Sequence, residues 1–166
     1  MRKLFIAAVC VQILILALVP YKKIRARFFG RDIVLVAEQY DPYDPFLGYY
    51  VRMSYEIGQR GTDKAFVPGR VYTVLETDAD GVTHPASVVK DRGDIPSNRQ
   101  FITGFSRGGT IEYGLEQYFV PEERHAEIDD ALRRAREDSV PIRARVRVDE
   151  AGNSALIGIT IGHVDY

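Results

Sequence analysis

The sequence contains a single cysteine, Cys10, so a disulfide within the chain is impossible and the paired cysteines of common redox and zinc motifs are absent. Net charge is also nearly missing, because 22 lysines and arginines face 23 aspartates and glutamates. A balanced chain has no global attraction to nucleic acid, so we expect no nucleic-acid partner. Stability must come from packing, for which 46% apolar residues suffice.

Clusters of metal ligands and a decisive catalytic constellation are missing too. The histidines, His84, His125 and His163, are far apart and have no spacing typical of a metal site. Asp78 and Asp80 begin like a calcium loop, but the later ligand positions and the distal glutamate are absent. We therefore expect no metal and no cofactor, and a solvated turn at Asp78.

The sequence does contain one long apolar run at its N-terminus. Residues 4–19 include a single frankly polar side chain, Gln12. Extended to Tyr21, a helix here would measure about 27 Å, close to the thickness of a bilayer's hydrocarbon. The residues before Pro20 make a poor signal-peptidase site, and a core helix would carry a polar stripe. We predict an uncleaved membrane anchor over 1–22, a basic linker over 23–30 and one domain over 31–166.

The side of the membrane on which this domain lies is open at this point. By the positive-inside rule alone, an excess of basic residues after the run would keep the domain in the cytoplasm. The basic residues after the run, Lys22, Lys23, Arg25 and Arg27, do outnumber Arg2 and Lys3 before it.

Alternation of apolar and polar residues predicts an antiparallel, β-rich domain. We expect strands over 33–38 and 49–57, a hairpin of 71–77 with 82–90, and a hairpin of 142–148 with 155–161. Residues 122–136 predict an amphipathic helix whose stripe is Ile128, Leu132 and Ala135. The fold class is α+β, mostly β: an N-terminal transmembrane helix, then one antiparallel domain with a single amphipathic helix.

The stretch DPYDPFLGYYVRMSY, residues 41–55, is the most distinctive of the chain. Its prolines hold Asp41 and Asp44 in extended conformations, from which their carboxylates can cap turns, and Gly48 can end the turn with a positive φ. Tyrosines on half-buried strands commonly pack with their hydroxyls at the rim. A rigid double turn feeding a strand is the favoured interpretation, and an aromatic rim that binds a soluble ligand is the alternative.

The segment GFSRG, residues 104–108, matches the nucleophile elbow of serine hydrolases, with Asp129 or Asp130 and then His163 following Ser106 in the right order. That motif needs a helix directly after the serine, whereas GTIEYG alternates like a strand. A glycine-rich turn between strands explains the segment better. The rival hypothesis is an enzyme, either a hydrolase using Ser106 or a carboxylate-dependent enzyme using Asp41, Asp44 or Glu116.

A stripe of three arginines, Arg143, Arg145 and Arg147, lies on one face of the strand predicted over 142–148. Such a stripe can grip a phosphate or a lipid head group. It is as well explained by a solvated strand face whose arginines pair with acidic side chains, which is the interpretation we favour.

Two segments carry a family resemblance. In GYYVRMSY, Gly48, Tyr50 and Tyr55 match the pattern G-D-Y-x-x-L-x-Y, while Met53 stands for its leucine and Tyr49 for its aspartate. The second segment is IEYGLEQYFVPE, residues 111–122, with Tyr113, Glu116 and Tyr118. With the N-terminal run, these segments resemble the GDYXXLXY family over nearly the whole chain.

The resemblance implies a small bacterial protein that is anchored in the inner membrane. Its domain is expected on the far side of that membrane, in the periplasm. Because members are often encoded beside predicted multi-spanning membrane proteins, the resemblance also implies an integral-membrane partner. It implies no activity, so we expect a non-enzymatic accessory or binding module. We expect Glu116 to be buried as the partner of an arginine such as Arg52. The candidate motif or binding residues are Asp41, Asp44, Gly48, Tyr50, Tyr55, Tyr113, Glu116 and Tyr118.

Overall fold

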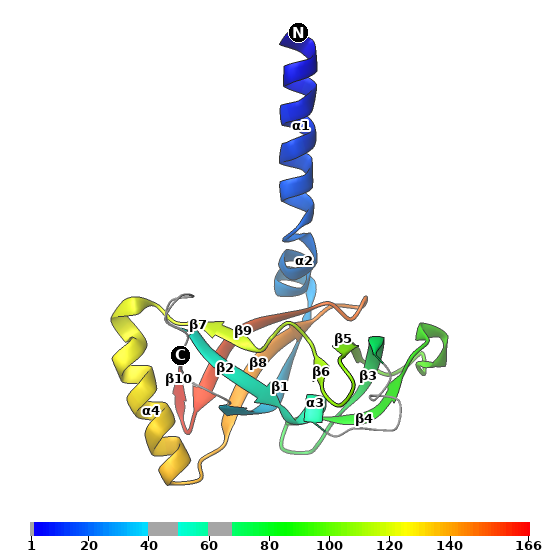
Figure 1. The fold of residues 1–166 in the computed structure, drawn as a ribbon. Helices are drawn as coiled ribbons and strands as arrows, with labels where there is room; N and C mark the ends of the chain where they lie inside the picture. Colours follow the sequence, from blue (N-terminus) through cyan, green and yellow to red (C-terminus); the bar gives the residue numbers. More distant parts are fainter. Residues whose placement is uncertain (1, 40–49, 60–67) are drawn as a thin grey trace.

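The computed structural model describes residues 2–39, 50–59 and 68–166. The chain begins with two helices, α1 (Arg2–Leu18) and α2 (Tyr21–Phe29), and continues as a β-rich domain (Figure 1). Its elements are β1 (Arg31–Gln39), β2 (Tyr50–Tyr55), α3 (Glu56–Gln59), β3 (Gly69–Thr77), β4 (Thr83–Val89), η2 (Arg92–Asp94), β5 (Phe101–Ser106), β6 (Ile111–Glu112), β7 (Gln117–Phe119), η3 (Glu122–Arg124), α4 (His125–Glu137), β8 (Ile142–Val148), β9 (Ser154–Ile161) and β10 (Val164–Asp165).

The strands form two antiparallel sheets. One has the order β10-β9-β8-β1-β2-β7 and the other the order β4-β3-β5-β6. In Figure 1, α4 lies beside the β10 end of the larger sheet, and the smaller sheet lies at the opposite end of the molecule. Both predicted hairpins are present, β3 with β4 and β8 with β9. The prediction of an antiparallel, β-rich fold is therefore confirmed.

The core follows the predicted alternation of side chains. In β2, Val51, Met53 and Tyr55 are buried while Arg52 is exposed. Every second residue of β8 is likewise buried. The predicted helix stripe, Ile128, Leu132 and Ala135, packs into the same core from α4.

Two predicted boundaries are wrong in detail. The strand expected to run to Ile57 ends at Tyr55, and residues 56–59 form the short helix α3, in which Ile57 is still buried. The helix expected over 122–136 starts as the 3-10 turn η3, with Pro121 before it, and becomes α-helical only at His125. In both places the hydrophobic pattern located the buried side chains correctly but not the backbone conformation.

The N-terminal helix differs from the prediction of one helix to Tyr21. It breaks after Leu18, and Pro20 occupies the N-cap of α2. Residues 23–30, expected as a linker, are helical to Phe29, and α2 packs on β8 and β9 with Ala26 fully buried. Taken singly, no described helix is long and apolar enough to cross a membrane, but α1 and α2 together meet that test, with a 46° bend between them.

The glycine-rich segment 104–108 makes the predicted turn between strands. Ser106 is the last residue of β5, Gly108 has a positive φ of 89°, and β6 follows directly. Gly104 lies inside β5, where a Cβ would sit 2.5 Å from Cγ2 of Ile111 and 2.9 Å from Cε1 of Tyr113. The first glycine of the segment is therefore required by packing.

We expect Gly104→Ala to destabilise the protein by about 1–3 kcal/mol, because the added methyl overpacks the core against Tyr113. The measurement is a urea titration of the full chain followed by the near-ultraviolet circular dichroism of its tyrosines. Gly93→Ala is the matched control, since a Cβ at Gly93 would have no neighbour within 4 Å. Equal unfolding midpoints for the two variants would show that the space at Gly104 is not needed.

Candidate functional site

Three of the candidate residues, Asp41, Asp44 and Gly48, lie outside the residues that the structure describes. The remaining candidates belong to two segments that are distant in the sequence. The structure brings these segments together: β2 pairs with β7, so that Val51 lies opposite Tyr118. The pairing continues where Met53 donates its backbone N–H to the carbonyl oxygen of Glu116 over 2.8 Å.

The hydroxyl groups of Tyr55 and Tyr113 are buried and hydrogen-bonded to the backbone. Tyr55 donates to the carbonyl oxygen of Leu115 over 2.7 Å, which joins β2 to the loop between β6 and β7. Tyr113 donates to the carbonyl oxygen of Ile57 and accepts from Oγ1 of Thr73, both over 2.8 Å. A buried hydroxyl held in this way stabilises a fold, because leaving its partners unsatisfied is costly. These two tyrosines therefore stabilise the domain by linking segments that are distant in the sequence.

Tyr50 and Tyr118 lie nearer the surface. Both are half-buried, and the ring of Tyr50 packs against Phe119 with 6.1 Å between ring centroids. This position at the rim agrees with the expectation that strand tyrosines serve in packing.

Glu116 does not have the arginine partner that the sequence suggested. Its Oε1 accepts the backbone N–H of Tyr113 over 2.5 Å, and the structure has no ion pair between Glu116 and Arg52 among the described residues. Glu116 is half-buried. Its hydrogen bond to Tyr113 spans a tight turn in which Gly114 has a positive φ of 69°. The reason for the difference is local: the N–H of Tyr113 is three residues away, whereas Arg52 is an exposed residue of β2.

Beside these segments lies a groove of about 370 Å³. Its apolar part is formed by Met53, Tyr55 and Ile111, and its charged rim by Arg52, Glu112 and Glu116. Ser54, Gly58, Gln59 and Thr110 complete the lining. The groove combines apolar side chains with charges of both signs, as small-molecule binding sites do.

The residues of the proposed serine triad are placed on different elements. Ser106 is fully buried at the end of β5, in the four-stranded sheet. Asp129 and Asp130 lie on α4, and His163 lies in the turn between β9 and β10 of the other sheet. A strand rather than a helix follows Ser106, so the geometry of a nucleophile elbow is not formed.

One histidine cluster was missed by sequence reasoning, which treated the histidines as isolated. His84 Nδ1 lies 3.2 Å from Oε2 of Glu56, and its Nε2 lies 3.2 Å from Oδ2 of Asp78. Asp78 also caps its own turn: its Oδ1 accepts from the N–H of Val82, which is the largest cause lowering the pKa of this carboxyl, with His84 adding to it. Only the β3–β4 pairing and the position of α3 bring these groups together. Among the described residues, no group of three or more side chains could hold a metal ion.

A second feature that the sequence did not reveal is the attachment of α2. Asp149, in the turn between β8 and β9, is buried, and its Oδ1 accepts the N–H groups of Ala151 and Asn153. Its Oδ2 lies 3.4 Å from Nε of Arg25 on α2. Lys23 donates to the carbonyl oxygen of Gly114 over 2.7 Å. The helix is thus fixed both to the β8–β9 turn and to the second motif segment.

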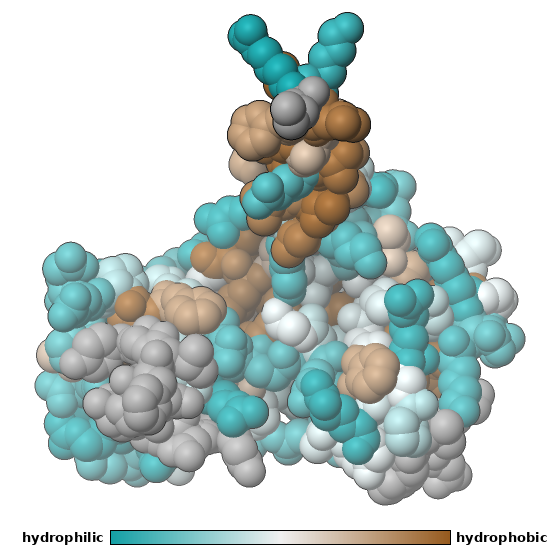
Figure 2. All heavy atoms as spheres, turned by 45° about the horizontal axis from the view of Figure 1, so that its top comes forward, coloured by the Kyte–Doolittle hydropathy of each residue, from teal (hydrophilic) through white to brown (hydrophobic). Residues whose placement is uncertain are grey.

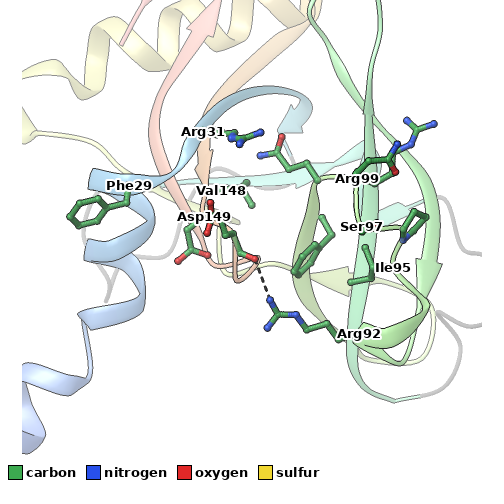
Figure 3. Close-up of a pocket in the computed structure, with 13 residues that line it drawn as sticks. Phe29, Arg31, Arg92, Ile95, Ser97, Arg99, Val148 and Asp149 are labelled. Atoms are coloured by element: carbon green, nitrogen blue, oxygen red, sulfur yellow. Dashed lines mark hydrogen bonds between the residues drawn. The ribbon is translucent and has the colours of Figure 1, made fainter.

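Three large cavities flank this attachment, and two of them also reach η2 and the smaller sheet. One, of about 550 Å³, is shown in Figure 3, where Arg92 reaches from η2 to the carbonyl oxygen of Glu150 over 3.3 Å. The other, of about 520 Å³, lies between α2, the smaller sheet and the β8–β9 turn. Arg92 lines both cavities.

Comparison with known families agrees with these motifs. A family model described as GDYXXLXY protein matches residues 12–159. The chain belongs to the GDYXXLXY family. No curated protein and no solved structure gives a match to it.

The structure explains part of the GDYXXLXY pattern in this member. Met53, in the place of the leucine, and Tyr55, the last tyrosine, point to the same buried face because they are two residues apart on β2. The pattern's aspartate position is Tyr49, which lies outside the described residues. Within the described part, the signature of the GDYXXLXY family is therefore a packing motif.

We expect the stability of the protein to fall as the pH rises above about 10. Burial is the main cause that raises the pKa of Tyr55 and Tyr113, with the Glu116 charge adding to it. The unfolded tyrosines ionise near pH 10 while the folded ones keep their protons. Each then lowers the free energy of unfolding by about 1.4 kcal/mol per pH unit. Urea midpoints between pH 8 and 11 measure this slope.

Tyr113→Phe should be less stable than wild type at pH 8 but should lose stability less steeply above pH 10. Thr73→Val is the matched control, because it removes a hydroxyl partner of Tyr113 and leaves the titrating group in place. We expect this control to be less stable at every pH and to keep the wild-type slope. A Tyr113→Phe slope equal to that of wild type would contradict the assignment.

Proposed function

We propose that this protein is a membrane-tethered, extracytoplasmic accessory or binding module that acts with an integral-membrane partner and has no catalytic activity of its own. The observation that carries the proposal is the surface of α1. All its described side chains are exposed, including Phe5 (71%) and Leu16 (63%), and none of its residues packs into the domain. An apolar helix that the domain leaves uncovered is stabilised by an apolar environment, and α1 together with α2 meets the length and hydropathy of a span.

The position of α1 supports a tether. It rises away from the two sheets, as Figure 1 shows, so its whole circumference is available to lipid. Basic residues follow it directly, in α2, where their charged ends can reach the head groups while their stems lie along apolar surface. We place the span at the inner membrane and the domain in the periplasm, in line with the properties that the GDYXXLXY resemblance implies.

The short connection between anchor and domain supports a role in an assembly. Two residues separate α1 from α2, and α2 is held by Asp149 and by the carbonyl oxygen of Gly114. A domain held in this way keeps one orientation above the membrane, whereas a flexible linker would let it sample many. A fixed orientation favours a partner in the same membrane.

The edge of the larger sheet at β7 is the surface we assign to this partner. Among the residues that the structure describes, β7 pairs with β2 on one side only and ends the sheet. It carries Phe119, whose side chain is 65% exposed and rests on Tyr50. An exposed edge with an aromatic anchor is typical of sites where another chain adds its backbone or side chains.

The test is purification of the full chain, tagged after Tyr166, from membranes in a mild detergent. We expect a multi-spanning membrane protein to elute with it, and we expect Phe119→Ser to reduce the amount retained about tenfold or more. Phe105→Ser is the matched control, since Phe105 is also an exposed strand phenylalanine, at 50%, but on the other sheet. A chain that always elutes alone from membranes would contradict the proposed partnership.

The side of the membrane has its own test, because the basic residues of α2 favour the cytoplasm by charge alone. Alkaline phosphatase fused after Tyr166 is active only outside the cytoplasm, and a green fluorescent protein fused there folds best inside it. We expect the phosphatase fusion to be active and the fluorescent fusion to be dark. The reverse pattern would leave the tether but move the module to the cytoplasmic face.

A further inference from the structure

The cavity beneath α2 is lined by basic side chains that the fold gathers from three separate elements. Lys22, Lys23 and Arg25 come from α2, Arg70 from β3, and Arg92 from η2. Of the described residues that line this cavity, none is acidic. Its volume of about 520 Å³ holds a small anionic group. Such a concentration of one charge is costly without a counter-ion, in a chain whose total charge is nearly balanced.

The charges of this cavity are only partly neutralised by the protein. Arg25 faces the buried carboxylate of Asp149, and the charge of Lys23 also interacts with Glu116. Arg92 donates to a carbonyl oxygen and lies 5.4 Å from the ring centroid of Phe101, which leaves its charge uncompensated. Within the described ranges, no carboxylate lies at ion-pair distance from Lys22, Arg70 or Arg92.

The cavity also contains neutral groups suited to an oxyanion. Tyr72 and Thr103, which carry hydroxyl groups, line it from the smaller sheet. Arginines paired with hydroxyl donors are common phosphate-binding groups.

The location of the cavity favours a lipid as the source of that phosphate. α2 forms one of its walls, and α2 begins two residues after α1. Figure 2 views the molecule from the side on which α1 rises, and hydrophilic side chains surround the base of the apolar helix there. With α1 in a bilayer, this surface lies at the level of the lipid head groups.

We propose that the cavity beneath α2 binds the anionic phosphate head group of a membrane glycerophospholipid. The inference rests on the proposed tether for the source of the ligand, and on the cavity itself for its chemistry. Arg70 and Arg92 are the cations that the domain contributes, and Lys22, Lys23 and Arg25 are those that the helix contributes. The bound head group would join the two.

The test uses the full chain in a mild non-ionic detergent and native mass spectrometry. Phosphatidylglycerol, phosphatidylcholine, inorganic phosphate and glycerol 3-phosphate are the probes. We expect one phosphatidylglycerol to be retained, at least about tenfold more tightly than phosphatidylcholine, and increasing salt to weaken it. Arg70→Gln should weaken retention on the order of fivefold, and adding Arg92→Gln should weaken it about fivefold again.

The matched control is the double variant Lys90→Gln, Arg143→Gln. This variant also loses two positive charges, but from exposed residues outside the cavity. Its retention of phosphatidylglycerol should therefore equal that of wild type. The single variant Arg70→Gln is expected to fold like wild type, because Arg70 is exposed and has no hydrogen bond to a described side chain. A loss of lipid retention in this variant therefore cannot be attributed to misfolding.

Three results would overturn the proposal. They are equal retention of phosphatidylglycerol and phosphatidylcholine, equal retention by wild type and the double variant Arg70→Gln, Arg92→Gln, and competition by glycerol 3-phosphate as strong as by the lipid. The last result would assign the cavity to a soluble phosphate. Failure of the tether is distinguishable from all three, because it appears as a chain recovered without membranes whatever the lipid measurement gives.

Discussion

The burial of one carboxylate determines how the two halves of this chain are joined. Asp149 is 5% exposed, and a buried charge is tolerated only where hydrogen bonds and a counter-charge compensate it. The turn supplies the N–H groups of Ala151 and Asn153 together with the side-chain amide of Asn153. Arg25 supplies the positive charge from α2. The β8–β9 turn and α2, which leads to α1, therefore depend on each other.

The signature segments of the GDYXXLXY family perform the corresponding task inside the domain. Tyr55 and Tyr113 close hydrogen bonds to carbonyl oxygens of segments about sixty residues away in sequence, as the separations of 60 and 56 residues for their two bonds show. Gly104 leaves the space that the ring of Tyr113 occupies. In this chain the ring of Tyr113, the missing side chain of Gly104 and the carbonyl group of Ile57 therefore depend on one another.

Much of this fold could be predicted from the sequence because its physical basis is local. A period of two on β2 and β8 identified both strands and their buried faces, and the stripe of Ile128, Leu132 and Ala135 identified α4. The prediction of a solvated arginine face also holds for two of its three members, since Arg145 pairs with Asp165 and Arg147 with Asp32. Periodicity reports which side of an element is buried and needs no knowledge of the partner.

The attachment of α2 and the candidate site could not be predicted in this way. Lys23 reaches the carbonyl oxygen of Gly114, 91 residues later, and that contact has no periodic signal. The carboxylate of Glu116 accepts a hydrogen bond from the backbone N–H of Tyr113, three residues away, and does not pair with Arg52. The basic cavity is the clearest case: its five cations are scattered among 22 lysines and arginines, so only the topology reveals that they share one space.

The cavity also connects the attachment of α2 to function. Three of its five cations are carried by α2 and two by the domain, so the site is complete only while the helix remains attached. Because like charges repel, the five cations oppose the attachment when the cavity is empty and favour it when an anion neutralises them. The contact between Asp149 and Arg25 works against that repulsion. An anionic ligand would therefore add to the stability of the joint, and more so as its concentration rises; under the proposed tether, the orientation of the domain would respond to the lipids around its base.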